Sequence, residues 1–484
     1  MTTKEVNQKM TNFRWVLCGL LFLATTINYM DRQVLSLTWK DFIAPEFHWN
    51  NGNYGLIAAA FSICYAVANI FSGRIIDWLG TRKGYLWAIG IWSAGACLHA
   101  GCGWATEHVV GMSSAASLIG ATGGAVSMIT TVSVFFFIAA RIVLAVGEAG
   151  NFPSAVKVTA EYFPKRDRAF ATSIFNAGST VGALVAPLCI PTIARYFQSI
   201  GVGNGWEMAF VIIGVLGFVW MGLWVFAYRD LDHNPRVNKA ERNYILQDEA
   251  AGKTTTTEEE TGRPITLREC VRMRQTWAIV LAKFFSDGVW WFILFWTPAY
   301  VSDVMGYRSD TLMAQMLIFT LYALTLLSLY GGKLPSIIMD RTGRGAYDSR
   351  LRAMLIFAVV PLLGLLAQPL GRYSCWFTII LLGLILAAHQ SWSANLYSVG
   401  SDLFPKRAVG TITSLNGMAG GVGSFLINIG SGYLLDYVEA HHFALMGFEG
   451  KEAGYMLIFC YCSVAYLIGW SIMKALVPKY NPVK

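Results

Sequence analysis

The sequence predicts an all-α integral membrane protein with twelve transmembrane helices arranged as two six-helix bundles. Three observations lead to this prediction: the composition, the spacing of the apolar segments and a repeat between the two halves of the chain. Of the 484 residues, 55% are hydrophobic and only 14% are charged, whereas soluble domains have about 25% charged residues. Such a chain cannot cover its surface with polar groups in water, so most apolar residues are expected to face lipid or each other. A soluble enzyme is therefore excluded.

Twelve apolar segments are long enough to cross a bilayer as helices, which need about 20 residues each. They lie at residues 15–38, 54–76, 85–105, 134–161, 169–195, 208–228, 276–301, 312–339, 351–370, 375–401, 410–435 and 455–476. A polar stretch between the sixth and seventh segments is typical of a solvated linker. The predicted domains are an N-terminal bundle (1–228), this linker (229–274) and a C-terminal bundle (275–484).

The basic residues predict the orientation in the membrane, because cytoplasmic loops carry an excess of Lys and Arg. The side that holds both termini and the linker has 26 of the 37 basic residues, and the opposite loops have 5. Both termini and the linker are therefore predicted to be cytoplasmic. The net charge of +8 follows from this bias, so no nucleic-acid partner is expected.

The two halves of the chain repeat two motifs at matching places. Gly73–Lys83 after the second segment is matched by Ser336–Arg344 after the eighth. Phe163–Arg166 after the fourth segment is matched by Phe404–Arg407 after the tenth, an offset of 241 residues. A duplication of this kind, with a binding site between the repeats, is typical of transporters.

The loop after the second segment resembles the G-x-x-x-D-R/K-x-G-x-R/K-R/K signature of the major facilitator superfamily, with Trp78 in place of a basic residue. Further segments resemble its anion:cation symporter family, and most closely the bacterial hexuronate transporters. These segments are Asn28–Arg32, Arg141–Glu148, Asn151–Pro153, Phe175–Gly178, Lys283–Phe292 and Phe295–Pro298. The resemblance implies the major facilitator fold and a multi-pass protein of the bacterial inner membrane. Residues 107–133 are longer than the connection this family has there, and no role is predicted for them.

Charged side chains inside the predicted spans are few, and each costs about 2.5–3.5 kcal/mol at the centre of a bilayer by insertion scales. Arg141 and Glu148 share one face of the fourth span but lie about 10 Å apart along its axis, too far for a mutual salt bridge. Each is therefore expected to meet another helix or a substrate. Burial favours the neutral form of Glu148 and a nearby Arg opposes this, as a proton-coupling site requires. A fixed interhelical ion pair is the alternative.

Asp31 and Arg32 are adjacent in the first span and point about 100° apart around the helix. One is expected to face a central cavity and the other a neighbouring helix. The resemblance implies that Asp31 is a protonation site and that Arg32 lies near the substrate carboxylate, with Tyr29 beside them. A guanidinium suits this role because its planar fork binds a carboxylate through two parallel hydrogen bonds. In the alternative, Asp31 only holds Arg32 in place.

Lys283 and Asp287 are four residues apart in the seventh span, so they lie on one face and within reach of each other. A self-neutralising pair and a role in substrate binding both stay open. His389 follows Glu148 by the repeat offset of 241 residues, which predicts that it lines the same cavity. A packing role for this His is the alternative.

Neutral polar and aromatic side chains at midspan are candidates for reading sugar hydroxyls and stacking on a sugar ring. With the charged groups, the predicted substrate-binding residues are Tyr29, Arg32, Tyr65, Arg141, His389, Gln390, Trp392, Asn395 and Asn416. The repeated loops carry charge at the membrane surface, which suits a gate latch between the bundles. The predicted gating residues are Asp77, Arg82, Asp340 and Arg341.

The sequence therefore predicts a proton-coupled symporter that imports a hexuronate, glucuronate or galacturonate, by alternating access. Asp31 and Glu148 are the predicted proton-coupling residues. A symporter for an aldonate or aldarate is the first alternative, and a transporter-like nutrient sensor is the second. The chain has no phosphate-loop, metalloprotease or nucleophile-elbow motif, so an enzyme is not expected. The expected partners are a sugar-acid anion, a proton and the lipid bilayer, with no metal or cofactor and a monomeric chain.

Overall fold

The computed structural model describes residues 9–247, 267–331 and 333–483, so the centre of the predicted linker lies outside the described residues. The first half of the chain is helical. Its elements are α1 (Phe13–Thr38), the π-helix η1 (Trp39–Ile43), α2 (Ala44–Phe47), α3 (Asn51–Leu79), α4 (Thr81–Ala100), α5 (Cys102–Val110), α6 (Ala115–Ile119), α7 (Gly124–Glu148), α8 (Asn151–Tyr162), α9 (Lys165–Ser199) and α10 (Trp206–Ala227). The described linker adds η2 (Leu231–His233), α11 (Lys239–Ile245) and α13 (Leu267–Val271).

The second half is also helical, apart from one short antiparallel pair of strands in the connection between its last two helices. Its elements are α14 (Arg274–Asp303), α15 (Leu312–Leu324), η4 (Thr325–Leu327), α16 (Ser328–Gly331), α17 (Leu334–Thr342), α18 (Ala346–Val359), η5 (Val360–Leu366), α19 (Ala367–Gly371), α20 (Cys375–Leu403), α21 (Lys406–Ala440), β1 (Ala444–Leu445), β2 (Phe448–Glu449) and α22 (Lys451–Leu476).

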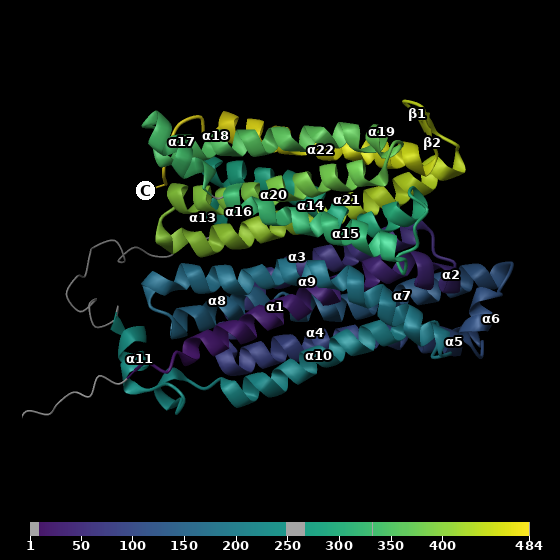
Figure 1. Cartoon of the computed structure of the whole chain (residues 1–484), viewed down its shortest axis with the longest axis horizontal. Coiled ribbons are helices and arrows are strands. Elements are labelled where there is room, and N and C mark those ends of the chain that lie inside the picture. Colours follow the sequence, from purple (N-terminus) through teal and green to yellow (C-terminus); the bar gives the residue numbers. More distant parts are fainter. Residues whose placement is uncertain (1–8, 248–266, 332, 484) are drawn as a thin grey trace, which may run out of the picture.

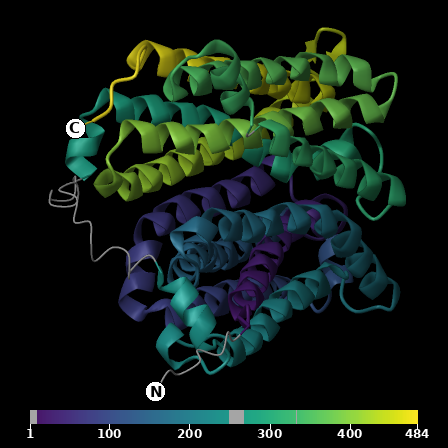
Figure 2. The ribbon, with the colours of Figure 1, turned by 60° about the vertical axis from the view of Figure 1, so that its left-hand side comes forward.

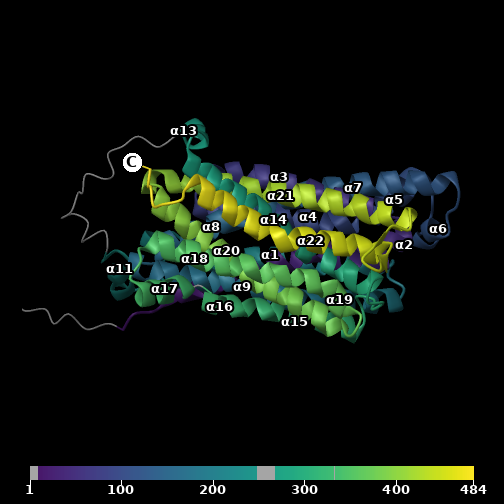
Figure 3. The same cartoon turned by 90° about the horizontal axis from the view of Figure 1, so that it is seen from above.

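The helices form two layers, one from each half of the chain, with their long axes roughly parallel (Figures 1 and 2). Helices α11 and α13 and the C-terminus lie at one end of the molecule, which we call the terminal end (Figures 1 and 3). The connections α2, α5 and α6 and the strands β1 and β2 lie at the opposite, distal end (Figure 1). This arrangement puts the start of α1, the described parts of the linker and the end of α22 on one side, as an even number of spans requires.

Ten helical segments in the described part of the chain are long and apolar enough to cross a membrane. The other two predicted spans are helical but weaker. Helix α4 has 20 residues and begins with Arg82 and Lys83 in its first turn. The predicted eighth span is divided into α15, η4, α16 and α17, of which Leu312–Leu327 is a shorter apolar stretch. The all-α membrane architecture is confirmed, while the count of twelve requires these two weaker segments.

The repeat between the halves is visible in the helix bounds. Helix α9 begins at Lys165 and ends at Ser199, and α21 begins at Lys406 and ends at Ala440. Both helices have 35 residues, and both bounds differ by the 241 residues read from the Phe-Pro-Lys-Arg motifs. In each case a Pro in extended conformation precedes the helix, at a position where its missing backbone N–H costs no hydrogen bond of the helix.

Small residues allow the closest helix contacts across and within the layers. A side chain at Gly182 of α9 would clash with the backbone of α1 at Thr26. A side chain at Gly421 of α21 would clash with Ala66 of α3, in the contact that joins the two layers. Small residues at such positions bring backbones together where helices pack by van der Waals contact.

Residues 107–133, for which the sequence predicts no role, form the end of α5, helix α6 and the first turns of α7. The His48 ring nitrogen Nε2 lies 2.9 Å from the carbonyl oxygen of Leu118, and Thr130 Oγ1 donates to the carbonyl of Phe47 at 2.9 Å. The insert therefore packs on the α2 connection and covers the distal end of the first layer (Figure 1).

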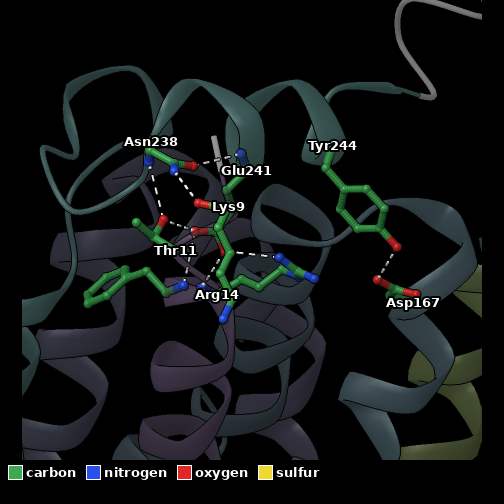
Figure 4. Close-up of polar contacts among 8 residues, drawn as sticks. Lys9, Thr11, Arg14, Asp167, Asn238, Glu241 and Tyr244 are labelled. Atoms are coloured by element: carbon green, nitrogen blue, oxygen red, sulfur yellow. Dashed lines mark hydrogen bonds and ion pairs between the residues drawn. The ribbon is translucent and has the colours of Figure 1, made fainter. Parts of the chain in front are cut away.

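The linker helix α11 caps the start of α1 (Figure 4). The buried carboxylate of Glu241 accepts hydrogen bonds from Thr11 Oγ1 (2.5 Å), Phe13 N (3.0 Å) and Arg14 N (3.1 Å), and it pairs with Arg14 Nη1 at 3.1 Å. Backbone N–H groups in the first turn of a helix have no partner within the helix, so this carboxylate supplies one. Its negative charge also suits the positive end of the helix dipole.

The same linker helix contacts α9. Tyr244 OH donates to Asp167 Oδ2 at 2.9 Å, and the Arg14 guanidinium carbon lies 4.8 Å from the centre of the Tyr244 ring (Figure 4). Helix α11 therefore ties α1 and α9 together at the terminal end of the first layer.

Replacing Glu241 with Ala is expected to lower the free energy of unfolding by about 3–5 kcal/mol, because Arg14 then stays buried without its partner. The exposed pair of Asp232 and Arg242, with side chains 65% and 46% exposed, supplies a matched control. Asp232→Ala is expected to cost less than about 1 kcal/mol. Thermal unfolding in detergent measures both variants, and equal shifts in Tm would contradict the capping role of Glu241.

Candidate functional site

A cavity of about 700 Å³ lies between the two layers. Helices α1, α3, α8 and α9 line it from the first half, and α14, α20 and α21 line it from the second half. Thr172 and Thr413, near the terminal ends of α9 and α21, are among the lining residues. The cavity therefore reaches from the middle of the molecule toward the terminal end, and its volume is typical of a small-molecule site.

Arg32 is the cation of the first-half wall. Its Nε donates to Glu148 Oε2 at 2.5 Å, and both side chains are buried. The guanidinium carbon lies 4.5 Å from the ring centre of Tyr65, 5.0 Å from that of Tyr29 and 5.4 Å from that of Trp291. These rings stabilise the cation through their faces. The buried Nη2 has no hydrogen-bond partner among the described residues.

Asp31 points away from this cavity. It is fully buried and is not among the lining residues, while the adjacent Arg32 is. This is the division that their 100° separation predicts. Neither carboxylate oxygen of Asp31 has a hydrogen-bond partner in the described part of the chain. The alternative in which Asp31 holds Arg32 in place is wrong, because Glu148 makes that contact.

Arg141 and Glu148 meet different partners, as their spacing along α7 predicts. Glu148 reaches across to Arg32 of α1, so the alternative of an interhelical ion pair describes its contact in this conformation. Arg141 is buried behind the wall, with its guanidinium carbon 5.5 Å from the ring centre of Phe61. Phe61 itself lines the cavity.

A second ion pair lines the cavity from the second half. Lys283 Nζ lies 3.0 Å from Asp287 Oδ1 and donates to Ser393 Oγ at 3.0 Å. Both charged side chains are buried, with 7% and 12% of their surface exposed. The predicted contact between them is confirmed. Each half thus contributes one cation that is paired with one carboxylate.

His389 lies in the wall beside this second pair. Its Nδ1 is 2.8 Å from Tyr466 OH, and its Nε2 is 3.9 Å from Asp287 Oδ1. The ring stacks on Trp290 with the ring centres 5.0 Å apart. The repeat offset therefore places His389 in the wall as expected, although Glu148, its counterpart, lies behind Arg32.

The predicted substrate-binding residues divide into two groups. Lining the cavity are Tyr29, Arg32, Tyr65, His389 and Gln390. Outside its lining are Arg141, Trp392, Asn395 and Asn416, all of which are buried.

The geometry of α20 explains two of these differences. Residues 389, 390, 393 and 397 share about 100° of its circumference, and this arc faces the cavity. Trp392 and Asn395 point outside the arc, where the Trp392 ring meets Tyr466 edge-on at 5.6 Å and Asn395 Nδ2 donates to the Ser391 carbonyl. In this conformation neither residue faces the cavity.

Several residues that line the cavity are not among the substrate-binding residues predicted from the sequence. Ser393 and Tyr397 follow His389 by four and eight residues, and Asn69 follows Tyr65 by four. A helical step of four from each predicted residue along the same face would have found all three.

The predicted gating residues lie at the terminal end. Asp77 pairs with Lys157 at 2.8 Å, and Arg82 Nη2 donates to the Val225 carbonyl at 3.1 Å, so both contact the first layer. Asp340 and Arg341 are exposed on α17. A latch between the layers at these loops stays a prediction.

The layers contact each other through carboxylates at the distal end. The contacts are Lys40 Nζ to Asp303 Oδ1 (2.8 Å), Ser309 N to Asp41 Oδ2 (2.7 Å) and Asn51 Nδ2 to Asp436 Oδ1 (2.8 Å). Each contact joins a residue of the first half to one of the second. Polar contacts thus join the two layers on the distal side of the cavity, and the cavity itself extends toward the terminal end.

A helical membrane protein with two repeated halves around a central cavity, with charged side chains in the cavity wall, has the architecture of a secondary transporter. The model of the Major Facilitator Superfamily matches residues 21–428. The chain belongs to this superfamily, and it is a multi-pass membrane transporter and not an enzyme.

Several proteins similar to this chain are named as transporters of sugar acids. It is 27% identical over 435 residues to the hexuronate transporter of Escherichia coli strain K12, covering 89% of this chain and 90% of that one. It is 25% identical over 300 residues to the galacturonate transporter of Dickeya chrysanthemi, covering 62% and 75%. It is 25% identical over 478 residues to the "Probable galactarate/D-glucarate transporter GarP" of Escherichia coli strain K12, covering 96% and 97%.

Solved structures support the fold. A bacterial homologue of the human lysosomal transporter Spinster, in an inward-facing conformation, superposes with a TM-score of 0.68 at 18% identity over 97% of this chain and 99% of that one. A D-xylose-proton symporter superposes with a TM-score of 0.63 at 18% identity over 97% and 99%.

Proposed function

We propose that this protein imports a hexuronate, galacturonate or glucuronate, together with protons. The observation that carries the proposal is the Arg32 guanidinium. It lies in the cavity wall close to the faces of three aromatic rings. Its Nε pairs with Glu148, and its Nη2 has no partner among the described residues. A planar cation of this kind suits a carboxylate.

The remaining wall suits a sugar. Tyr29, Tyr65, Gln390 and Asn176 offer hydroxyl and amide groups to sugar hydroxyls, and Trp290 offers an aromatic face to a sugar ring. The names of the relatives, which are hexuronate and galacturonate transporters, support the same class of substrate.

Proton coupling is supported by the balance of buried charge. Three cations in and behind the wall, Arg32, Arg141 and Lys283, are matched by three carboxylates, Asp31, Glu148 and Asp287. An added substrate carboxylate upsets this balance in a medium where charge is costly. Protonation of Glu148 restores the balance and releases Arg32 to the substrate, and the unpartnered Asp31 is suited to carry a second proton.

Alternating access is supported by the asymmetry of the contacts. With the terminal end in the cytoplasm of a bacterial cell, the conformation described here is open inward and closed at the distal end. The bundles 1–228 and 275–484 then move about the linker 229–274, and Asp77, Arg82, Asp340 and Arg341 latch the terminal end in the other conformation. A single chain contains both bundles and the whole cavity, which supports a monomer.

An aldarate is the second candidate substrate. Lys283 places a second cation in the wall, and an aldarate has a carboxylate at each end. The galactarate/D-glucarate relative at 25% identity supports the same candidate.

Uptake into proteoliposomes tests the proposal. Labelled galacturonate is expected to accumulate when the outside is acidic, and unlabelled glucuronate is expected to compete. Uncharged galactose is the control and is not expected to compete, because it offers no carboxylate to Arg32. Absence of uptake with every sugar acid, or equal competition by galactose, would overturn the proposal.

A further inference from the structure

We propose that Asp287 makes the cavity select sugar acids with one carboxylate over those with two, because it neutralises Lys283, the second cation of the wall. This inference rests on the proposed function and adds the residue that separates hexuronates from aldarates. It starts from the ion pair in α14, whose role the sequence leaves open.

Each half of the chain contributes one cation to the wall of the cavity. Arg32 lies 5.4 Å from the ring of Trp291, and Trp291 follows Asp287 by one helical turn, about 6 Å of helix axis. The Lys283 ammonium lies 3.0 Å from the Asp287 carboxylate. Both cations line the same cavity. If Lys283 were free, this site would hold an aldarate by both ends.

Lys283 is not free. Its ammonium contacts the Asp287 carboxylate and donates to Ser393 Oγ. A second substrate carboxylate arriving here would be placed against the carboxylate of Asp287, and like charges that meet in a site of low dielectric repel each other strongly. A hydroxyl group meets no such cost, since it can accept from the ammonium or donate to the carboxylate. The pair therefore suits the neutral end of a hexuronate.

Two other helices of the second half approach the Asp287 carboxylate. A side chain on Gly420 of α21 would clash with its carboxylate, so this glycine leaves the space that the carboxylate fills. His389 Nε2 lies 3.9 Å away on α20 and is itself fixed by Tyr466 of α22. The space beside Gly420 and the position of His389 therefore accommodate the carboxylate next to the Lys283 ammonium.

The variant Asp287→Asn removes the negative charge of this side chain and keeps its shape. The amide has the size of the carboxylate and fits beside Gly420, but it leaves Lys283 uncompensated. The test measures how unlabelled galacturonate and galactarate inhibit the uptake of labelled galacturonate. Its readout is the ratio of the two inhibition constants. Wild type is expected to favour galacturonate. In Asp287→Asn the ratio is expected to shift toward galactarate by at least about tenfold.

The matched control is the double variant Lys283→Gln with Asp287→Asn, which removes both charges. Its ratio is expected to return toward the wild-type value, because the gain belongs to the freed ammonium. Asp287→Ser is a second neutral replacement and is expected to shift the ratio in the same direction if the Asn variant does not fold.

Three results would overturn this inference: an unchanged ratio in both neutral variants, an equal shift in the double variant, or a wild type that takes galactarate as well as galacturonate. Failure of the proposed function has a different signature, since wild type would then take up no sugar acid at all.

Discussion

Glu148→Gln is expected to lower the accumulation of galacturonate that a proton gradient drives, while exchange of internal for external galacturonate continues. The amide keeps the size of the side chain beside Arg32 but cannot release and rebind a proton. Without a co-transported proton, a monoanion that enters a negative-inside compartment meets about 2.3 kcal/mol per 100 mV. Accumulation is therefore expected to fall by about 50-fold at 100 mV. Uptake and exchange in the same proteoliposomes measure both quantities.

Glu46→Gln is the matched control for this prediction. Glu46 is equally buried in the first half, but it lies at the distal end and accepts from Trp206 Nε1 at 2.7 Å and Asn204 Nδ2 at 3.2 Å. A Gln oxygen can still accept both hydrogen bonds, so this variant is expected to keep its coupling. Accumulation by Glu148→Gln at the wild-type level would show that Glu148 is not a coupling residue.

Arg32→Ala is expected to weaken galacturonate binding by at least about 30-fold, which is the low end of the 2–5 kcal/mol lost when a buried, hydrogen-bonded charge pair loses one partner. Arg32→Lys is expected to restore only part of the affinity, because an ammonium keeps the charge but not the planar fork. Protection of the purified protein against thermal unfolding by galacturonate measures binding without transport.

Arg195→Lys controls for a general effect of changing a basic residue. Arg195 is 66% exposed at the distal end, 3.9 Å from Asp310, and its replacement is expected to leave binding unchanged. If Arg32→Ala binds galacturonate as wild type does, the carboxylate is bound elsewhere and Lys283 becomes the first candidate.

Much of the fold follows from the sequence because the two halves of the chain repeat the same motifs. The Phe-Pro-Lys-Arg turns give the same bounds to α9 and α21, and the few intramembrane charges identify Arg32, Lys283 and Asp287 as parts of the wall. Charge inside a bilayer is costly enough to be rare, so each such residue carries information.

Other parts of the site depend on how helices are rotated against each other, which a single sequence does not specify. Glu148 of α7 pairs with Arg32 of α1, and these two residues are 116 positions apart in the sequence. The side of α20 that carries Trp392 faces helix packing and not the cavity. The distal contact of Lys40 with Asp303 belongs to one conformation of the transporter, and no periodicity in the chain reports which loops meet in it.

The central claim is that one carboxylate-bearing sugar enters together with protons. It is tested most directly by a pH dye trapped inside proteoliposomes that start with equal pH on both sides. Adding galacturonate outside is expected to acidify the interior in wild type and not in Glu148→Gln. Entry of labelled galacturonate into wild-type vesicles without any acidification would contradict the account.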